Sequence, residues 1–129
     1  MAYSNSKRPL SPHATIYRWP LNAIMSILHR ITGVGLVLSA VLIVWVFVAA
    51  ATSERYYNFT SWIVSSFIVD LILFGSLVAF WFHYFNGIRH LFWDIGLSFE
   101  ERNIKISAYL GIVGTVVMSL LSIVYIWLY

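Results

Sequence analysis

The sequence contains no cysteine and few charged residues. Of its 129 residues, 10% are Asp, Glu, Lys or Arg, whereas 60% are hydrophobic. The lack of cysteine excludes a disulfide, a thiolate metal site and cysteine ligation of an iron–sulfur cluster, so any redox chemistry needs histidine or an organic cofactor. This fraction of charged residues is far below that of soluble domains, which predicts that water is not the main solvent of this chain.

Long polar stretches are also scarce, because three apolar runs of at least 22 residues each occupy residues 31–52, 62–85 and 106–129. A helix of about 20 residues crosses ~30 Å of hydrocarbon. We therefore predict an all-α integral membrane protein with one domain, residues 1–129, whose transmembrane helices span about 20–52, 62–93 and 106–129. We expect residues 1–19 to lie on the inner membrane surface. The remainder is too short for a soluble catalytic domain, which must belong to a partner.

Basic residues are distributed unevenly around these runs. Arg55 alone lies between the first and second runs, whereas the other seven Lys and Arg residues precede the first run or follow the second. This bias predicts a cytoplasmic N-terminus. The net charge of +3 is spread over span ends rather than along one face, so we exclude nucleic-acid binding. The first twenty residues resemble neither a signal peptide nor a transit peptide, which favours a bacterial inner membrane over the mitochondrial one.

Several polar residues lie near the start of the first predicted helix, before its apolar centre. Ser26 and Arg30 are four residues apart and therefore share a face, with His29 and Gly33 flanking it. Arg30 has two interpretations. It either extends to lipid phosphate, or it stabilises an anion in a partly dry pocket.

One histidine lies on a stripe of small residues in the second predicted helix, formed at four-residue spacing by Gly75, Ala79, His83 and Gly87. Small residues at this spacing are common where helices pack closely, with the histidine hydrogen-bonded across the interface. The sharper interpretation is that His83 ligates a haem iron, because neutral imidazole binds iron well and small neighbours admit a flat porphyrin.

Three further features concern the second and third predicted helices. His90 and Asp94, one turn apart at the end of the second helix, are interpreted as a docking surface for a soluble subunit, as a proton-uptake route, or as a solvated helix end. Asp70 lies within the second apolar run, and the sequence alone does not account for it. The third helix is predicted to be structural, since Gly111, Gly114, Thr115 and Ser119 indicate close packing.

Three segments together closely resemble the cytochrome b subunit of succinate dehydrogenase. They are Arg-Pro-Leu-Ser-Pro-His at 8–13, Ile-Met-Ser-Ile-Leu-His-Arg-Ile-Thr-Gly at 24–33 and His-Tyr-Phe-Asn-Gly-Ile-Arg-His-Leu-Phe-Trp-Asp at 83–94. The resemblance covers nearly the whole chain in order. It implies a membrane anchor of complex II, the succinate:ubiquinone oxidoreductase of electron transport and the tricarboxylic acid cycle. Such an anchor is part of an enzyme and not an enzyme on its own.

The resemblance also implies partners, cofactors and site residues. The partners are a flavoprotein subunit, an iron–sulfur subunit and a second anchor subunit, with which this chain would form a heterodimeric bundle that binds haem b and ubiquinone. His83 would be one axial haem ligand, the second anchor would supply the other, and His90 would not be a ligand. Ser26 and Arg30 would bind the quinone, and His29 and Arg30 would lie near the haem propionates.

Two other hypotheses assign the chain to a different functional class. A purely structural anchor without haem would explain the small-residue packing, but it would leave Ser26, Arg30 and His83 as coincidences. A transporter or channel subunit would need polar groups throughout the membrane depth, whereas here all except Asp70 gather toward one side. We therefore expect an electron-transfer anchor.

Overall fold

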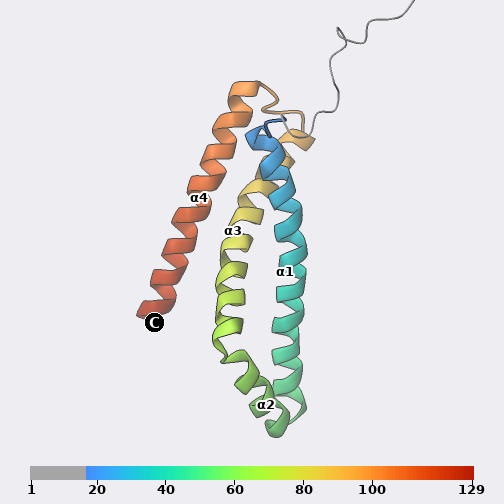
Figure 1. Cartoon of the computed structure of the whole chain (residues 1–129), viewed down its shortest axis with the longest axis vertical. Coiled ribbons are helices and arrows are strands. Elements are labelled where there is room, and N and C mark those ends of the chain that lie inside the picture. Colours follow the sequence, from blue (N-terminus) through green and yellow to red (C-terminus); the bar gives the residue numbers. More distant parts are fainter. Residues whose placement is uncertain (1–16) are drawn as a thin grey trace, which may run out of the picture.

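The computed structural model describes residues 17–129, which form four helices and no strand within that range (Figure 1). In chain order these are α1 (Leu21–Thr52), α2 (Glu54–Val64), α3 (Phe67–Asp94) and α4 (Glu101–Leu128). By length and composition, α1, α3 and α4 can each cross a membrane. These helices confirm the predicted all-α fold with three spans. The expected surface segment at 1–19 lies outside the described residues, apart from 17–19, and so does the segment 8–13.

The long helices define two ends of the bundle. The first turns of α1, the last turns of α3 and the first turns of α4 lie together at one end, which we call the histidine end (top of Figure 1). The short helix α2 lies at the opposite end, which we call the α2 end. From the histidine end, α4 leans away from α1 toward its C-terminus. The three spans therefore come closest together at the end where the predicted site residues lie.

The first helix begins one residue later than predicted. Pro20 has a φ of −66°, which suits a helix, but its ψ of 151° is extended, so it precedes the first turn. Its carbonyl oxygen accepts hydrogen bonds from the backbone N–H groups of Ala23 at 3.0 Å and Ile24 at 3.3 Å. Pro20 thus ends the extended segment and provides the first acceptor for α1.

The connection between the first two spans contains a helix, although the predicted spans of about 20–52 and 62–93 leave the residues between them outside any helix. Ser53 caps α2, because its Oγ accepts a hydrogen bond from the backbone N–H of Tyr56 at 3.3 Å. The Tyr56 hydroxyl accepts a second hydrogen bond from Trp45 Nε1 at 2.7 Å, which holds α2 against α1. The segment is short and has no long apolar run, so its helix is not predicted by the apolar pattern.

The later start of α3 explains Asp70. Since α3 begins at Phe67, Asp70 lies in its first turn, and its side chain is exposed on this chain. A carboxylate is favourable there, because the first backbone N–H groups of a helix lack intrahelical partners and carry partial positive charge. Asp70 is therefore a residue of a helix end and not a charge in the middle of a span.

Most of the residues that are buried between the helices are small or polar. The Ser39 and Ser76 hydroxyls join α1 to α3 at 2.6 Å, and Trp81 Nε1 donates to Ser122 Oγ between α3 and α4 at 3.0 Å. On α4 the buried residues are small, namely Ala108, Gly111, Thr115 and Ser119. Most large apolar side chains of residues 17–129 point outward instead. This arrangement suits a lipid solvent, in which close backbone approach and hydrogen bonds drive helix association.

Candidate functional site

Three imidazole rings converge at the histidine end. His29 from α1 lies flat against His83 from α3, with ring centroids 3.9 Å apart and planes 11° apart. The ring of His90, which is also on α3, has its centroid 5.0 Å from that of His29. The sequence placed His29 and His83 near the same side of the membrane, but it did not predict that their rings stack.

The Nδ1 atom of His83 is held by two oxygen atoms of α1. It lies 3.1 Å from the His29 carbonyl oxygen and 3.2 Å from Thr32 Oγ1. The Thr32 hydroxyl donates its only hydrogen to the His29 carbonyl oxygen at 3.0 Å, so toward His83 it can only accept. Both oxygens therefore accept from Nδ1–H. The proton of a neutral His83 is thus on Nδ1, and Nε2 keeps the lone pair that binds a metal.

The backbone approaches His83 closely at Gly33. A Cβ atom added at Gly33 would lie 3.0 Å from His83 Cε1, closer than most real Cβ contacts. Because Nδ1 is fixed by two hydrogen bonds, the ring cannot easily move aside. A glycine is therefore needed at position 33 so that the His83 ring can pack against α1.

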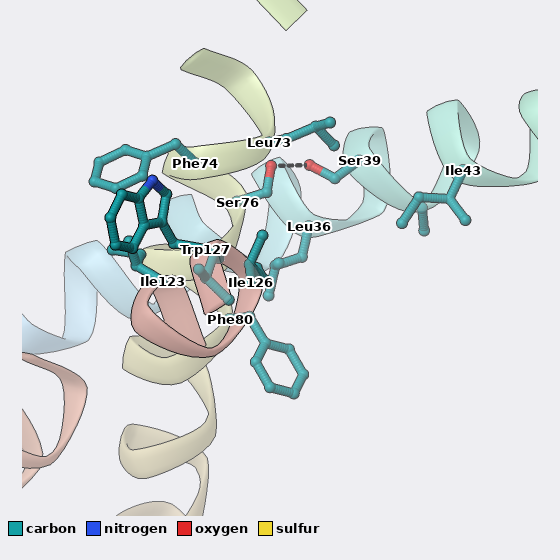
Figure 2. Close-up of a pocket in the computed structure, with 12 residues that line it drawn as sticks. Leu36, Ser39, Ile43, Leu73, Phe74, Ser76, Phe80, Ile123, Ile126 and Trp127 are labelled. Atoms are coloured by element: carbon teal, nitrogen blue, oxygen red, sulfur yellow. Dashed lines mark hydrogen bonds between the residues drawn. The ribbon is translucent and has the colours of Figure 1, made fainter. Parts of the chain in front are cut away.

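Two apolar grooves run along the helices away from this cluster. One, of about 500 Å³, is lined by Thr32, Gly35, Gly75 and Ala79, so it reaches the threonine that is bonded to His83. The other, of about 840 Å³, lies between α1, α3 and α4 beside the Ser39–Ser76 pair, with Trp127 next to Phe74 (Figure 2). The larger groove contains none of the predicted site residues, and only the smaller one adjoins the His83 contacts.

Ser26 and Arg30 lie one turn apart on α1, as their spacing predicted. Ser26 is half-buried and Arg30 is exposed, and within residues 17–129 neither side chain has a hydrogen-bond partner. A hydroxyl donor and a guanidinium are thus available on the helix that also carries His29. Together they can bind an oxygen atom that carries or gains negative charge.

The structure does not pair His90 with Asp94. The His90 ring is half-buried and packs edge-to-face on Trp93, with centroids 5.0 Å apart, while its other neighbour is His29. Asp94 is the last residue of α3 and is exposed. Although their spacing allows contact, the aromatic packing turns the imidazole toward the bundle and leaves the carboxylate at the surface.

Sequence reasoning missed a buried cation beside the cluster. Arg89 is 7% exposed, and its guanidinium donates to Asn86 Oδ1 at 2.5 Å, Ser107 Oγ at 3.2 Å and Asn22 Oδ1 at 3.2 Å. These acceptors belong to α3, α4 and α1. The three-residue spacing of Asn86 and Arg89 was an available signal, because it places both on one face of an otherwise apolar helix.

The fold and the cluster define a small three-span membrane protein that carries histidines at one end of its bundle. More narrowly, this chain belongs to the succinate dehydrogenase/fumarate reductase transmembrane subunit family, whose model matches residues 4–122. The succinate dehydrogenase cytochrome b556 subunit of Paracoccus denitrificans is 44% identical over 121 residues, covering 94% of this chain and 93% of that protein.

More distant relatives carry related names. The cytochrome b556 subunit of succinate dehydrogenase from Rickettsia conorii is 35% identical over 116 residues, with 90% of each chain covered. The cytochrome b560 subunit from Marchantia polymorpha is 33% identical over 123 residues, covering 91% of this chain and 89% of that protein. The likeness therefore extends over nearly the whole chain and confirms the family that the sequence motifs indicated.

Proposed function

We propose that this chain is a membrane-anchor subunit of a succinate:ubiquinone oxidoreductase. In this role it binds haem b together with a second anchor subunit and passes electrons from an iron–sulfur subunit to ubiquinone. A flavoprotein subunit oxidises succinate, so the anchor alone is not an enzyme. The relatives named as cytochrome b subunits of succinate dehydrogenase support this assignment.

The proposed haem ligand is His83, and the hydrogen bonding of its Nδ1 atom is the observation that carries the proposal. The contacts of Nδ1 with the His29 carbonyl oxygen and Thr32 Oγ1 leave the lone pair on Nε2, as iron ligation requires. When bound, haem b supplies a one-electron redox centre. The second anchor would provide the opposite ligand.

Two further residues fit the haem propionates. His29 Nδ1 is buried and has no hydrogen-bond partner within the described residues, and a buried polar atom of this kind calls for a ligand or water. A propionate oxygen is a suitable acceptor for an N–H at this atom. Arg30, one residue further on α1, is the matching cation.

Ser26 and Arg30 are the proposed quinone-binding residues. As a quinone is reduced, its oxygen atoms gain negative charge, and a hydroxyl donor and a guanidinium aimed at one of them lower the barrier. Neither group needs to move a proton to do this. Binding and orientation of the quinone are therefore the work that we assign to this face of α1.

The proposed location is a bacterial inner membrane, with the histidine end on the cytoplasmic side. Arg55 is the only cation in or next to the α2 end among residues 17–129, whereas the others in that range flank the histidine end. The positive-inside rule supports this orientation. It also places His90 and Asp94 toward the soluble subunits, where docking or proton uptake remains our proposal for them.

One paired measurement on the purified complex tests the function. We expect a b-type absorbance in the reduced-minus-oxidised spectrum and succinate-driven reduction of a short-chain ubiquinone. A complex that oxidises succinate with an artificial dye but has no haem signal and no quinone activity would instead support the purely structural anchor.

Gly33→Ala should lower the haem content of the complex. The added methyl group meets His83 Cε1 at 3.0 Å, and a shift of the ring breaks the geometry of its Nδ1 contacts. Loss of such orienting contacts typically weakens metal binding roughly 10- to 100-fold. The measurement is haem absorbance per complex during titration with haem.

Gly35→Ala is the matched control for this variant. It is the same substitution two residues further along α1, where an added Cβ meets nothing within 4 Å in this chain. Equal haem contents in the two variants would show that the contact between Gly33 and His83 has no role in haem binding.

A further inference from the structure

The side chain of Arg89 joins three helices at the histidine end. Its donors reach Asn86 on α3, Ser107 on α4 and Asn22 on α1, and Nη2 also approaches the Ile104 carbonyl oxygen at 3.5 Å. All these acceptors are neutral. The Trp93 ring lies 5.0 Å from the guanidinium carbon and covers it further. A rigid planar cation thus holds the ends of α1, α3 and α4 in one arrangement.

On α1, the contact of Arg89 lies in line with the proposed quinone-binding residues. Asn22, Ser26 and Arg30 follow one another at four-residue spacing, so they form one face of the helix. Each four-residue step along this face advances about 6 Å along the helix axis. Because the two side chains share this face, a change in the rotation or tilt of α1 at Asn22 also moves the Ser26 hydroxyl.

Few side-chain contacts hold the first two turns of α1, which precede the His83 contacts of His29 and Thr32. Its N-cap, Pro20, makes no side-chain capping bond, and Met25 is the one buried residue in its first two turns. Among the described residues, the bond between Arg89 and Asn22 is the only side-chain hydrogen bond that ties residues 21–28 to another helix. That bond therefore helps to set the rotation of the helix at this point, together with the His83 contacts that begin one turn later.

We propose that Arg89 is a positioning residue for the quinone site, acting through Asn22 on Ser26. This inference rests on the proposed quinone-binding role of Ser26 and Arg30. Arg89 need not touch the quinone, since it acts by holding the face of α1 that does. Its effect should appear in the affinity for quinone more than in the assembly of the complex.

The test compares Asn22→Ala with Ser107→Ala in the assembled, membrane-bound complex. Each removes one acceptor of the same guanidinium, but only Asn22 belongs to α1. Asn22→Ala should raise the KM for a short-chain ubiquinone roughly three- to tenfold, as expected for one lost hydrogen bond. Ser107→Ala should leave this KM unchanged. Succinate oxidation by an artificial dye, which reports assembly, should be normal in both.

Two further variants separate positioning by Arg89 from direct contact of Asn22 with quinone. Asn22→Asp keeps an acceptor oxygen for the guanidinium and should restore the KM. Arg89→Gln should raise the KM as Asn22→Ala does, and combining the two should raise it no further. If Arg89→Gln does not assemble, Arg89→Lys, which loses the planar fork, serves in the same comparison.

The outcomes distinguish this inference from the proposed function. Equal KM changes in Asn22→Ala and Ser107→Ala, or additive effects of Asn22→Ala and the Arg89 variant, would overturn positioning through Asn22. An unchanged KM in Asn22→Ala would do the same, provided that Ser26→Ala raises it. If Ser26→Ala and Arg30→Leu have no effect on quinone kinetics, the proposed quinone site itself is wrong.

Discussion

The His83→Ala complex should lose its b-type absorbance while still oxidising succinate with an artificial dye. His83 is the proposed ligand because the His29 carbonyl oxygen and Thr32 Oγ1 both accept from its Nδ1 and leave Nε2 for iron. Alanine has no group that can replace this ligand. The measurement is the reduced-minus-oxidised spectrum of the purified complex, normalised to the amount of each subunit.

His90→Ala is the matched control for this result. It removes an imidazole from the same helix and the same cluster, 5.0 Å from the His29 ring, at a position that we do not propose as a ligand. We expect this variant to keep its haem. If the His83→Ala spectrum were unchanged, or if His90→Ala alone lost the signal, the ligand assignment would be wrong.

Arg30→Leu should lower succinate:quinone activity roughly a hundredfold, the effect typical of removing one group that stabilises developing charge. Leucine keeps the apolar part of the side chain but removes the guanidinium that we aim at the quinone oxygen. The flavoprotein and iron–sulfur subunits do not depend on this group, so succinate oxidation by an artificial dye should stay normal. The ratio of the two activities is the measurement.

Arg55→Leu provides the control for the change in charge. Arg55 is also exposed, but it lies on α2 at the opposite end of the bundle, so its removal should not change the ratio. Equal loss of quinone and dye activities in Arg30→Leu would contradict the assigned role, because it would show that Arg30 is needed for assembly of the complex rather than for quinone binding alone.

Helix α2 lies largely between two predicted spans, and there is a physical reason why the sequence did not predict it. Long apolar runs indicate only the helices that span the membrane, because the bilayer requires such runs of a spanning helix. Helix α2 is short and mixed in polarity, and it is held by a Ser53 cap and by the Trp45–Tyr56 hydrogen bond. The cap could have been read from the sequence. The hydrogen bond could not, because it depends on how α2 folds back on α1.

Arg89 illustrates the same limit within the candidate site. Its spacing from Asn86 predicts a shared helix face, but its other partners are far away in sequence. Asn22, for example, precedes it by 67 positions. Which distant side chains meet depends on the rotation and depth of each helix in the bundle. In the sequence Arg89 is only one of the basic residues that follow the second apolar run, whereas in the structure it is a buried link between three helices.

The sequence by itself determined the all-α class, the three spans, the family and the placing of Ser26 with Arg30. These follow from length, apolarity and helical spacing, which are local properties of the chain. Only the tertiary structure decided that His29 stacks on His83 and that the His29 carbonyl, 54 positions away, orients the His83 ring. The reason is that such contacts arise from the relative rotation of α1 and α3, which no local pattern specifies.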